Sequence, residues 1–404
     1  MADLRPFDAL SPPPELARAI ASVPYDVINS AEARALAAGN PLSFLHVIRP
    51  EIDLSEDVDL YSDAVYAKGA ENLERWIRET PFSDHGGPVF FVYRLVQDGR
   101  AQIGIVAGCS VDEYDSGLIA IHERTRQKKE DDRTRHVVQM RCQAEPIFLA
   151  YRSNARIAEI VDEITAAPPA VDFVADDGVR HSLWTAPDAT SLSSAFEEVP
   201  RLYVADGHHR TKSASRARLA LSEAEGGINP DAAYNRVMAV VFPDNQLEIL
   251  PYNRVVLDLG GRSAAEVITD LVERFGAVPI SDATPDRRHS FCVYGDGNWY
   301  QFVLSPQGEG VIDALDVTLL QDQLLQPLFG IDDPRTDPGI DFVGGSRGTA
   351  ELERRSDAAN GIAFSLFPTS LEELFAVADA GEIMPPKSTW FEPKLRSGLF
   401  IHRI

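Results

Sequence analysis

The sequence of 404 residues has few cysteines, no long apolar run and no secretion-type start. Its three cysteines (Cys109, Cys142 and Cys292) form no CxxC pair, which argues against a disulfide framework or a zinc cage and favours a reducing compartment. The most apolar run, residues 88–96, contains Arg94 and is too short to cross a bilayer. No charged-then-apolar segment opens the chain. We therefore expect a cytoplasmic globular protein.

Positive charge is also scarce. Lys and Arg number 38 against 62 Asp and Glu, so the formal net charge is −24. Such a chain is poorly suited to displace counterions from nucleic acid or to adhere to an anionic membrane. We expect neither as a partner. At roughly 150 residues per domain, the length predicts two or three domains.

Hydrophobic periodicity and turn residues predict an α+β chain with an N-terminal and central region, residues 1–260, and a C-terminal α+β region, residues 261–404. In the first region we expect helices at 30–38, 58–79, 157–166 and 208–224, strands at 147–151 and 202–205, and hairpins at 89–96/102–111 and 237–242/247–250. In the second we expect helices at 264–275, 315–328 and after Ser370, and strands at 290–294, 299–304 and 363–367.

The most specific local feature is VADGHHRT at residues 204–211. A buried strand, a glycine turn and a helix start leave backbone N–H groups pointing outward at the positive end of the helix dipole, which favours an anion. Asp206 is expected to cap the helix or to hold a proton or Mg²⁺, and Gly207 lets backbone approach a ligand. Further donors follow at His208, His209 and Arg210. Ordinary capping needs only the aspartate, so we interpret this turn as an anion site.

A basic island follows the His122–Glu123 pair, with Arg124, Arg126, Lys128, Lys129, Arg133, Arg135 and Arg141. In an acidic chain such an island suits a multiply charged anion such as a polyphosphate. It equally suits a solvated helix, because Glu130, Asp131 and Asp132 lie among the basic residues. Glu123 is a candidate general base.

A proline-rich segment, MPPKSTWFEPK at residues 384–394, lies near the C-terminus. Its prolines fix an extended approach, and Lys387, Ser388 and Thr389 are able to bind a phosphate or carboxylate. A loop that closes a domain is the alternative. Two other strings, residues 24–26 and 251–254, are typical of packed turns.

Four motifs follow one another along the chain: PYDV at 24–27, the segment from His122 to Arg133, DGHHR at 206–210 and MPPKST at 384–389. Together they resemble the bacterial family called domain of unknown function 1015, over nearly the whole chain. The resemblance implies a ParB/sulfiredoxin-like mixed α/β core with a second, C-terminal α+β unit. Sulfiredoxin chemistry is disfavoured because His208 stands where its cysteine would be, and the charge of −24 disfavours a ParB-type DNA clamp.

Within that fold group the motifs are similar to those of the archaeal free-serine kinase. The resemblance implies that Glu123 is the base, that Asp206 is an active-site carboxylate, that the turn from Gly207 to Arg210 holds phosphate and that residues 387–389 lie near the substrate. Together with the local patterns, we expect catalytic roles for Glu123, Asp206, His208 and His209. We expect phosphate or nucleotide binding by Gly207, Arg210, Thr211, His122, Arg124, Lys128 and Arg133, and substrate binding by Lys387, Ser388, Thr389 and Trp390. The kinase segment continues with Arg and His, whereas Trp390 and Phe391 follow Thr389 here, so a partner for the substrate carboxylate is missing from this segment.

These residues predict a small-molecule kinase that transfers a phosphoryl group from ATP or ADP, with Mg²⁺, to a hydroxyl acceptor, first of all free L-serine. A nucleotide-binding switch of ParB-like type and a phosphatase or other hydrolase remain as alternatives.

Overall fold

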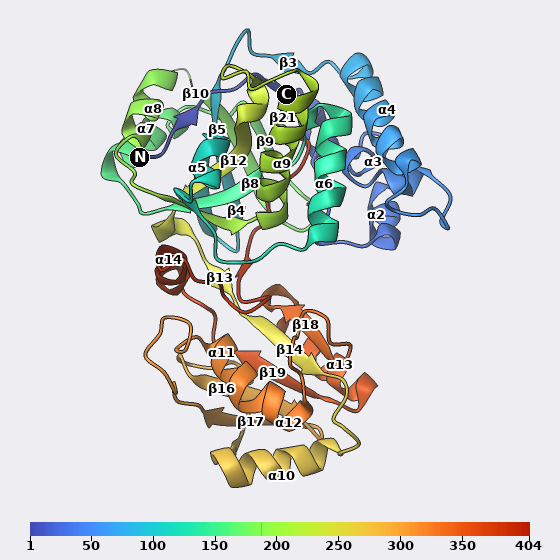
Figure 1. Ribbon diagram of the computed structural model, residues 1–404, viewed down its shortest axis with the longest axis vertical. Helices are drawn as coiled ribbons and strands as arrows, with labels where there is room; N and C mark the ends of the chain where they lie inside the picture. The colour runs from blue at the N-terminus through green and yellow to red at the C-terminus, as the bar shows by residue number, and fades with distance from the viewer. Residues whose placement is uncertain (187) are drawn as a thin grey trace. The chain divides into compact units, whose positions relative to one another are not determined.

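The computed structural model describes residues 1–186 and 188–404, without the side chain of residue 84, and the chain forms two compact units (Figure 1). Unit 1 comprises Met1–Ile121, Thr125–Leu247 and Pro393–Ile404, and unit 2 comprises His122–Arg124 and Glu248–Glu392. The division falls at Leu247, whereas the sequence places it near residue 260. The motif segments therefore belong to different units: the DGHHR turn is part of unit 1, and the His122–Glu123 pair and the PPKST loop are part of unit 2.

Unit 1 is built on a mixed sheet of nine strands among the described residues. Its order is β6 (Ile119–Ala120), β11 (Leu202–Asp206), β8 (Ile147–Tyr151), β12 (Arg236–Pro243), β5 (Arg100–Ser110), β4 (Phe90–Gln97), β10 (Arg180–Ala186) and β9 (Val171–Val174), and β1 (Leu4–Arg5) pairs with β5. The pairs β12·β8 and β11·β6 are parallel, and the others are antiparallel. The buried, β-branched and aromatic composition of β4 and β12 suits such central strands.

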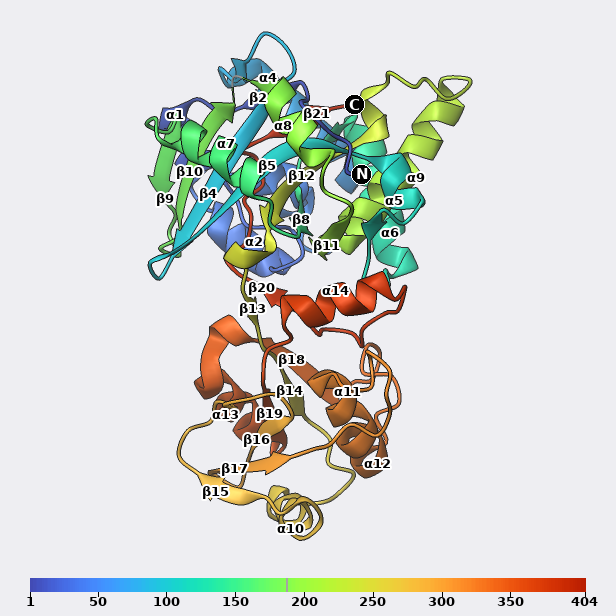
Figure 2. The ribbon, with the colours of Figure 1, turned by 90° about the vertical axis from the view of Figure 1, so that its left-hand side faces the viewer.

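Helices cover this sheet and close its core. They are α5 (Val111–Asp115), α6 (Gln127–Met140), α7 (Ala155–Thr165), α8 (Ala189–Phe196) and α9 (His208–Ala224). Ile157 of α7, Phe196 of α8 and Ala214 of α9 are buried in one cluster with the strand residues. Helix α7 lies against β4 and β10 (Figure 2), and α6 lies beside α9 (Figure 1). The pairing of α6 with α9 matters for function because α9 starts at the DGHHR turn.

A second apolar cluster in unit 1 is helical. It contains α1 (Pro14–Ile20), α2 (Ser30–Ala37), α3 (Leu45–Ile48) and α4 (Asp63–Glu79), next to a small sheet of β3 (Ser83–Asp84), β2 (Ala9–Ser11), β21 (Ile401–Arg403) and β7 (Cys142–Gln143). A capping box begins the predicted helix α2: Asn29 Oδ1 accepts from Glu32 N at 2.9 Å, and Glu32 Oε2 accepts from Asn29 N at 2.8 Å.

Unit 2 has an antiparallel sheet in the order β15 (Val278–Ile280), β17 (Asn298–Val303), β16 (Ser290–Gly295), β19 (Ile362–Leu366), β14 (Tyr252–Val256) and β18 (Ile340–Gly344). Its helices are α10 (Ala264–Phe275), α11 (Asp316–Leu320), α12 (Gln326–Phe329), α13 (Gly348–Ala359) and α14 (Leu371–Asp379), with a π-helical turn at Gln321–Leu325. A separate pair joins β13 (Ile249–Leu250) to β20 (Trp390–Phe391).

The predicted α+β class and most predicted elements are confirmed, and α9 and α10 have the expected bounds. The hairpin predicted from 237–242 and 247–250 is wrong. Strand β12 already pairs with β5 on one side and β8 on the other, so β13 pairs with β20 instead. The intervening loop is held by side chains: Asp244 accepts from Ser153 N, and Gln246 accepts from Ile103 N. Of the described helices, none has the length and apolar character needed to span a bilayer.

Candidate functional site

The turn from β11 into α9 is the centre of the candidate site in unit 1. Gly207 has a φ of 93°, a conformation that L residues rarely adopt, and a Cβ there would lie 3.2 Å from the Arg210 guanidinium carbon. Gly207 is the N-cap, and no side-chain cap is formed at this described helix end. Asp206 is the last residue of β11, so the expectation that it caps the helix is wrong. Thr211 Oγ1 donates to Gly207 O at 3.0 Å and tightens the first turn.

Asp206 instead binds two cations. Lys394 Nζ lies 2.9 Å from Asp206 Oδ2, and Arg210 Nη2 lies 3.7 Å from Asp206 Oδ1. Burial raises the pKa of Asp206, but the charges of Lys394 and Arg210 outweigh it and leave the pKa below its usual range. A carboxylate with so low a pKa is a weak base at neutral pH. Its role in this arrangement is to hold two cations at the start of α9.

Arg210 connects this pair to a second part of the site. Its guanidinium donates to Pro146 O and lies 3.9 Å from Asp26 Oδ2. Burial disfavours the charged guanidinium, but the carboxylates of Asp26, Asp206 and Glu145 raise the pKa of Arg210 overall. Asp26 belongs to the PYD string, which the sequence analysis interprets as a packed turn. The structure places it at the site, and the shared order of the motifs was the only signal for it.

Tyr25, Arg133 and Glu145 form the buried side of the site. Arg133 stacks on the Tyr25 ring at 4.1 Å and lies 3.8 Å from Glu145 Oε2, and Tyr25 N donates to Glu145 Oε1 at 3.1 Å. Lys129 Nζ lies 5.6 Å from the same ring. Burial lowers the pKa of Lys129 and raises that of Glu145. Sequence reasoning missed Tyr25, Glu145 and Lys394 as site residues.

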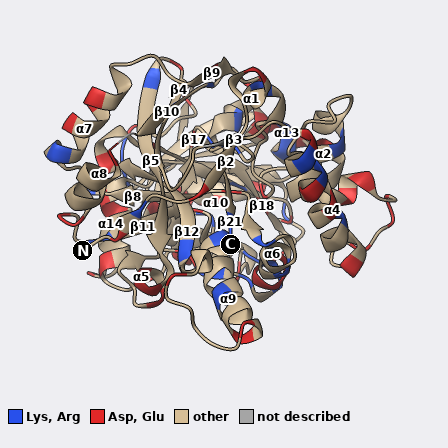
Figure 3. Cartoon of the chain, turned by 90° about the horizontal axis from the view of Figure 1, so that it is seen from above, with Lys and Arg blue, Asp and Glu red and all other residues tan. Residues whose placement is uncertain are grey.

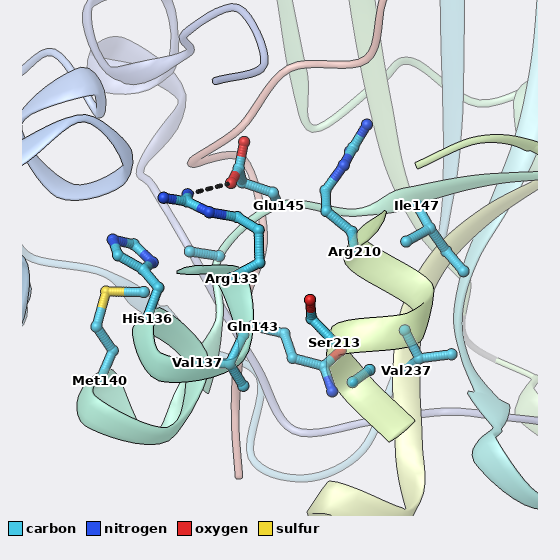
Figure 4. A pocket seen from close by; sticks show the side chains of 12 residues that line it. Arg133, His136, Val137, Met140, Gln143, Glu145, Ile147, Arg210, Ser213 and Val237 are labelled. Carbon is cyan, nitrogen blue, oxygen red and sulfur yellow. Dashed lines mark ion pairs between the residues drawn. The ribbon is translucent and has the colours of Figure 1, made fainter. Parts of the chain in front are cut away.

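A cavity of about 30 Å³ adjoins this buried side, and Figure 4 shows the ion pair between Arg133 and Glu145, two of its lining residues. Val137 and Met140 of α6 and Ser213 of α9 line it as well. It has room for water but not for a substrate. The site at the turn is therefore a charged surface backed by a nearly filled interior.

The two histidines of the turn differ. His208 is 6% exposed and His209 is half-buried. His209 Nε2 accepts from Arg126 N at 3.0 Å, so the ring proton lies on Nδ1. Burial lowers the pKa of His209, and Lys129 and Arg126 lower it further, although Asp26 opposes them. His209 is thus a neutral ring at neutral pH and fits a hydrogen-bonding role better than a cationic one.

The basic island does not form one patch. Arg133 and Lys129 contact Tyr25, whereas Lys128 lies over Tyr61 at 4.2 Å and Arg135 pairs with Asp63. Arg141 pairs with Glu225 at 3.1 Å, and Arg124 is exposed in unit 2. Figure 3 shows acidic and basic residues interspersed on the helices, α2 and α7 among them. The solvated-helix interpretation therefore describes most of the island, and the anion-site interpretation describes Lys129 and Arg133.

The second group of predicted residues lies in unit 2. Met384 N donates to His122 O at 2.9 Å, and His122 Nε2 lies 3.2 Å from Thr389 Oγ1, so the His122–Glu123 pair and the PPKST loop are joined. Glu123 is half-buried and Lys387 is exposed. Ser388 and Trp390 have structural contacts: Ser388 Oγ donates to Pro385 O at 2.6 Å, and Trp390 Nε1 donates to Glu392 Oε1 at 2.8 Å.

The described carboxylates of the turn do not fit a resident Mg²⁺. Both oxygens of Asp206 face cations, and Asp26 faces Arg210. Over the described residues, no group of three or more His, Cys, Asp or Glu side chains is arranged to hold a metal ion. A site rich in Lys and Arg is suited to the anion itself.

Comparisons with known proteins give one sequence match and several distant structural ones. The profile of the family described as "Protein of unknown function (DUF1015)" matches residues 4–318. No curated protein sequence matches significantly. C-terminally truncated SbnI from Staphylococcus aureus is 12% identical with a TM-score of 0.37, covering 71% of this chain and 82% of that one. A free serine kinase in complex with AMP is 14% identical with a TM-score of 0.35, covering 71% and 86%. A conserved hypothetical protein from Pyrococcus furiosus is 12% identical with a TM-score of 0.34, covering 73% and 93%.

Proposed function

Starting from the fact that the chain belongs to the DUF1015 family, a family of unknown function, we propose that it is a small-molecule kinase. It transfers a phosphoryl group from ATP or ADP to a hydroxyl acceptor, with free L-serine as the first candidate. The choice of serine rests on the motif resemblance to free-serine kinase. Mg²⁺ enters with the nucleotide, and no carboxylate of the chain is assigned to it.

The main support for this proposal is the pair of cations that Asp206 holds at the start of α9. Arg210 and Lys394 are fixed by ion pairs, so they lose little freedom when an anion binds. The helix dipole and the first backbone N–H groups of α9 add to their field. Phosphoryl transfer depends mainly on positioning and on neutralising charge, which is what this arrangement supplies. Gly207, His208 and Thr211 belong to the same turn and are assigned to the phosphates with Arg210.

The acceptor is assigned to unit 2. Glu123 takes the proton of the acceptor hydroxyl, and its neighbour His122 is held by Met384 and Thr389. Lys387 and Thr389 bind the acceptor, whereas Ser388 and Trp390 shape the loop that carries them. In unit 1, Arg133 acts from beneath the turn by holding Tyr25, and Lys128 adds positive charge at the surface; Arg124 adds positive charge at the surface of unit 2.

Phosphorus NMR of the purified protein with Mg²⁺, ATP or ADP and a mixture of free amino acids tests the proposal. A phosphomonoester resonance that appears only with serine supports it. Nucleotide loss without a phosphomonoester identifies a hydrolase instead. Protection from unfolding by nucleotide, with nothing consumed, identifies a nucleotide-binding switch.

Glu123→Gln tests the base. We expect turnover to fall by about 10²–10⁴-fold, because a positioned base contributes that much, while nucleotide affinity stays unchanged. Glu382→Gln, at an exposed glutamate of the same unit, is the matched control and should retain full turnover. Equal activity in Glu123→Gln removes Glu123 from the mechanism.

A further inference from the structure

Arg254 of β14 is a buried arginine that contacts no carboxylate of the residues that the structure describes. Three arginines in the described part of the chain are buried: Arg133 at 8% exposure, Arg254 at 3% and Arg396 at 4%. Arg133 pairs with Asp132 at 2.9 Å, and Arg396 pairs with Asp177. The described residues offer Arg254 only two carbonyl oxygens, of Tyr252 and Pro386, and the face of Phe342 at 5.0 Å. Buried charges in proteins are normally paired, so this exception requires an explanation.

The guanidinium of Arg254 is charged at neutral pH. Burial lowers the pKa of Arg254 to about 10, although Tyr252 opposes it, so the guanidinium stays protonated at neutral pH. Neutral carbonyl groups do not neutralise it. Among the described residues, Arg254 is therefore a desolvated cation without an ion pair.

The position of this cation links it to the PPKST loop. Arg254 Nη2 donates to Pro386 O over 3.3 Å, a long bond, whereas the far side of the loop is held by Thr369 Oγ1 donating to Ser388 O at 3.0 Å. Lys387, between them, has a left-handed φ of 60°, and its ammonium lies 5.3 Å from the Tyr252 ring. Tyr252 thus contacts both cations, through its carbonyl and through its ring.

We propose that Arg254 and Lys387 form the binding site for the carboxylate of the acceptor. The carboxylate takes the place of the Pro386 carbonyl at the guanidinium, whose fork of N–H donors matches its two oxygens. This inference rests on the proposed function and names its substrate class: a hydroxy compound that also bears a carboxylate. Arg254 and Lys387 would also supply the partner for the substrate carboxylate that is missing from the segment where Trp390 and Phe391 follow Thr389.

Binding measurements on the full chain test the proposal with four probes. O-phospho-L-serine and L-serine bear the carboxylate, and O-phosphoethanolamine and ethanolamine lack it. We expect the wild type to bind each carboxylate probe at least about 10-fold more tightly than its counterpart, as a charge-assisted bidentate contact implies. Arg254→Met should abolish this preference, and Arg254→Lys, which keeps the charge without the fork, should reduce it. The affinity for ADP should be the same in all three proteins.

Stability gives a second, independent readout. Removing an unpaired buried charge should leave the melting temperature unchanged or raise it, so Arg254→Met should be at least as stable as the wild type. Arg396→Met, which leaves Asp177 without its partner, should melt at a lower temperature. A purely structural Arg254 would behave like Arg396, so an unstable or unfolded Arg254→Met overturns the proposal.

The remaining outcomes separate this inference from the proposed function. If the wild type shows no preference for the carboxylate probes, or if Arg254→Met keeps that preference, the inference is wrong even where NMR shows a phosphomonoester. If the preference depends on Arg254 but no phosphomonoester forms with any acceptor, the carboxylate site stands and the kinase assignment falls.

Discussion

Lys394→Met offers the sharpest test of the site in unit 1. Lys394 Nζ lies 2.9 Å from Asp206 Oδ2, and the two side chains are 14% and 27% exposed. At an effective dielectric constant of about 20, charges at this distance attract by about 6 kcal/mol. Desolvation of the ammonium offsets most of that, and Arg210 still faces the aspartate in the variant. We therefore expect a net loss of about 2 kcal/mol in the free energy of unfolding.

Thermal unfolding at neutral pH measures this loss. For a unit of this size, about 2 kcal/mol corresponds to a decrease of about 4–8 °C in the melting temperature. Lys68→Met is the matched control, since Lys68 forms a pair with Glu71, which is 67% exposed, and such pairs contribute less than about 1 kcal/mol. If Lys394→Met and Lys68→Met lower the melting temperature equally, Lys394 does not hold Asp206 and the site as described is wrong.

The pH dependence follows from the lowered pKa of Asp206. A carboxylate with a lowered folded-state pKa stabilises the fold above its unfolded pKa, about 3.9, and loses that contribution as the pH falls further. Lys394→Met reduces the lowering of the pKa, so it removes part of this contribution. The difference in stability between the wild type and the variant should therefore narrow as the pH falls below about 4. A difference that stays constant from neutral to acid pH would assign the effect to packing.

Two further predictions concern Asp316 and Gly207. In unit 2 burial raises the pKa of Asp316 to about 6, although His289 N donates to its carboxylate. The cost to stability is therefore full above pH 6, declines as the pH falls below 6 and is gone only below the unfolded pKa of about 3.9. Asp316→Asn should stabilise the protein by about 2 kcal/mol at pH 8 and by about a third of that at pH 4.5 in urea unfolding, and an equal effect at both values would contradict this. Gly207→Ala should lower the free energy of unfolding by about 1–2 kcal/mol, because an L residue is strained at this positive φ. It should also weaken the binding of ADP, because the new Cβ displaces Arg210. An unchanged affinity for ADP would show that the turn does not bind the nucleotide.

Local signals determined much of the fold. The strand–glycine–helix pattern at residues 202–224 and the helix that begins after Ser370 depend on contacts within a few residues, and the structure has them as expected. The partner of a strand is a different matter. Ile249–Leu250 was assigned to its neighbour in sequence, but β12 has no free edge, so the segment pairs with Trp390–Phe391 far along the chain.

The candidate site divides in the same way. The DGHHR turn was predictable from neighbouring residues, because glycine geometry and a helix start are local properties, and the chain also indicated which segments carry ionisable groups. Which of these charges meet depends on how remote segments fold together. The fold brings Lys394 to Asp206 and gives Arg254 two carbonyl oxygens, with no carboxylate from the described residues. The pKa of a group and the partner of a charge depend on burial and on distances of a few ångströms between segments remote in sequence, and no spacing along the chain encodes them.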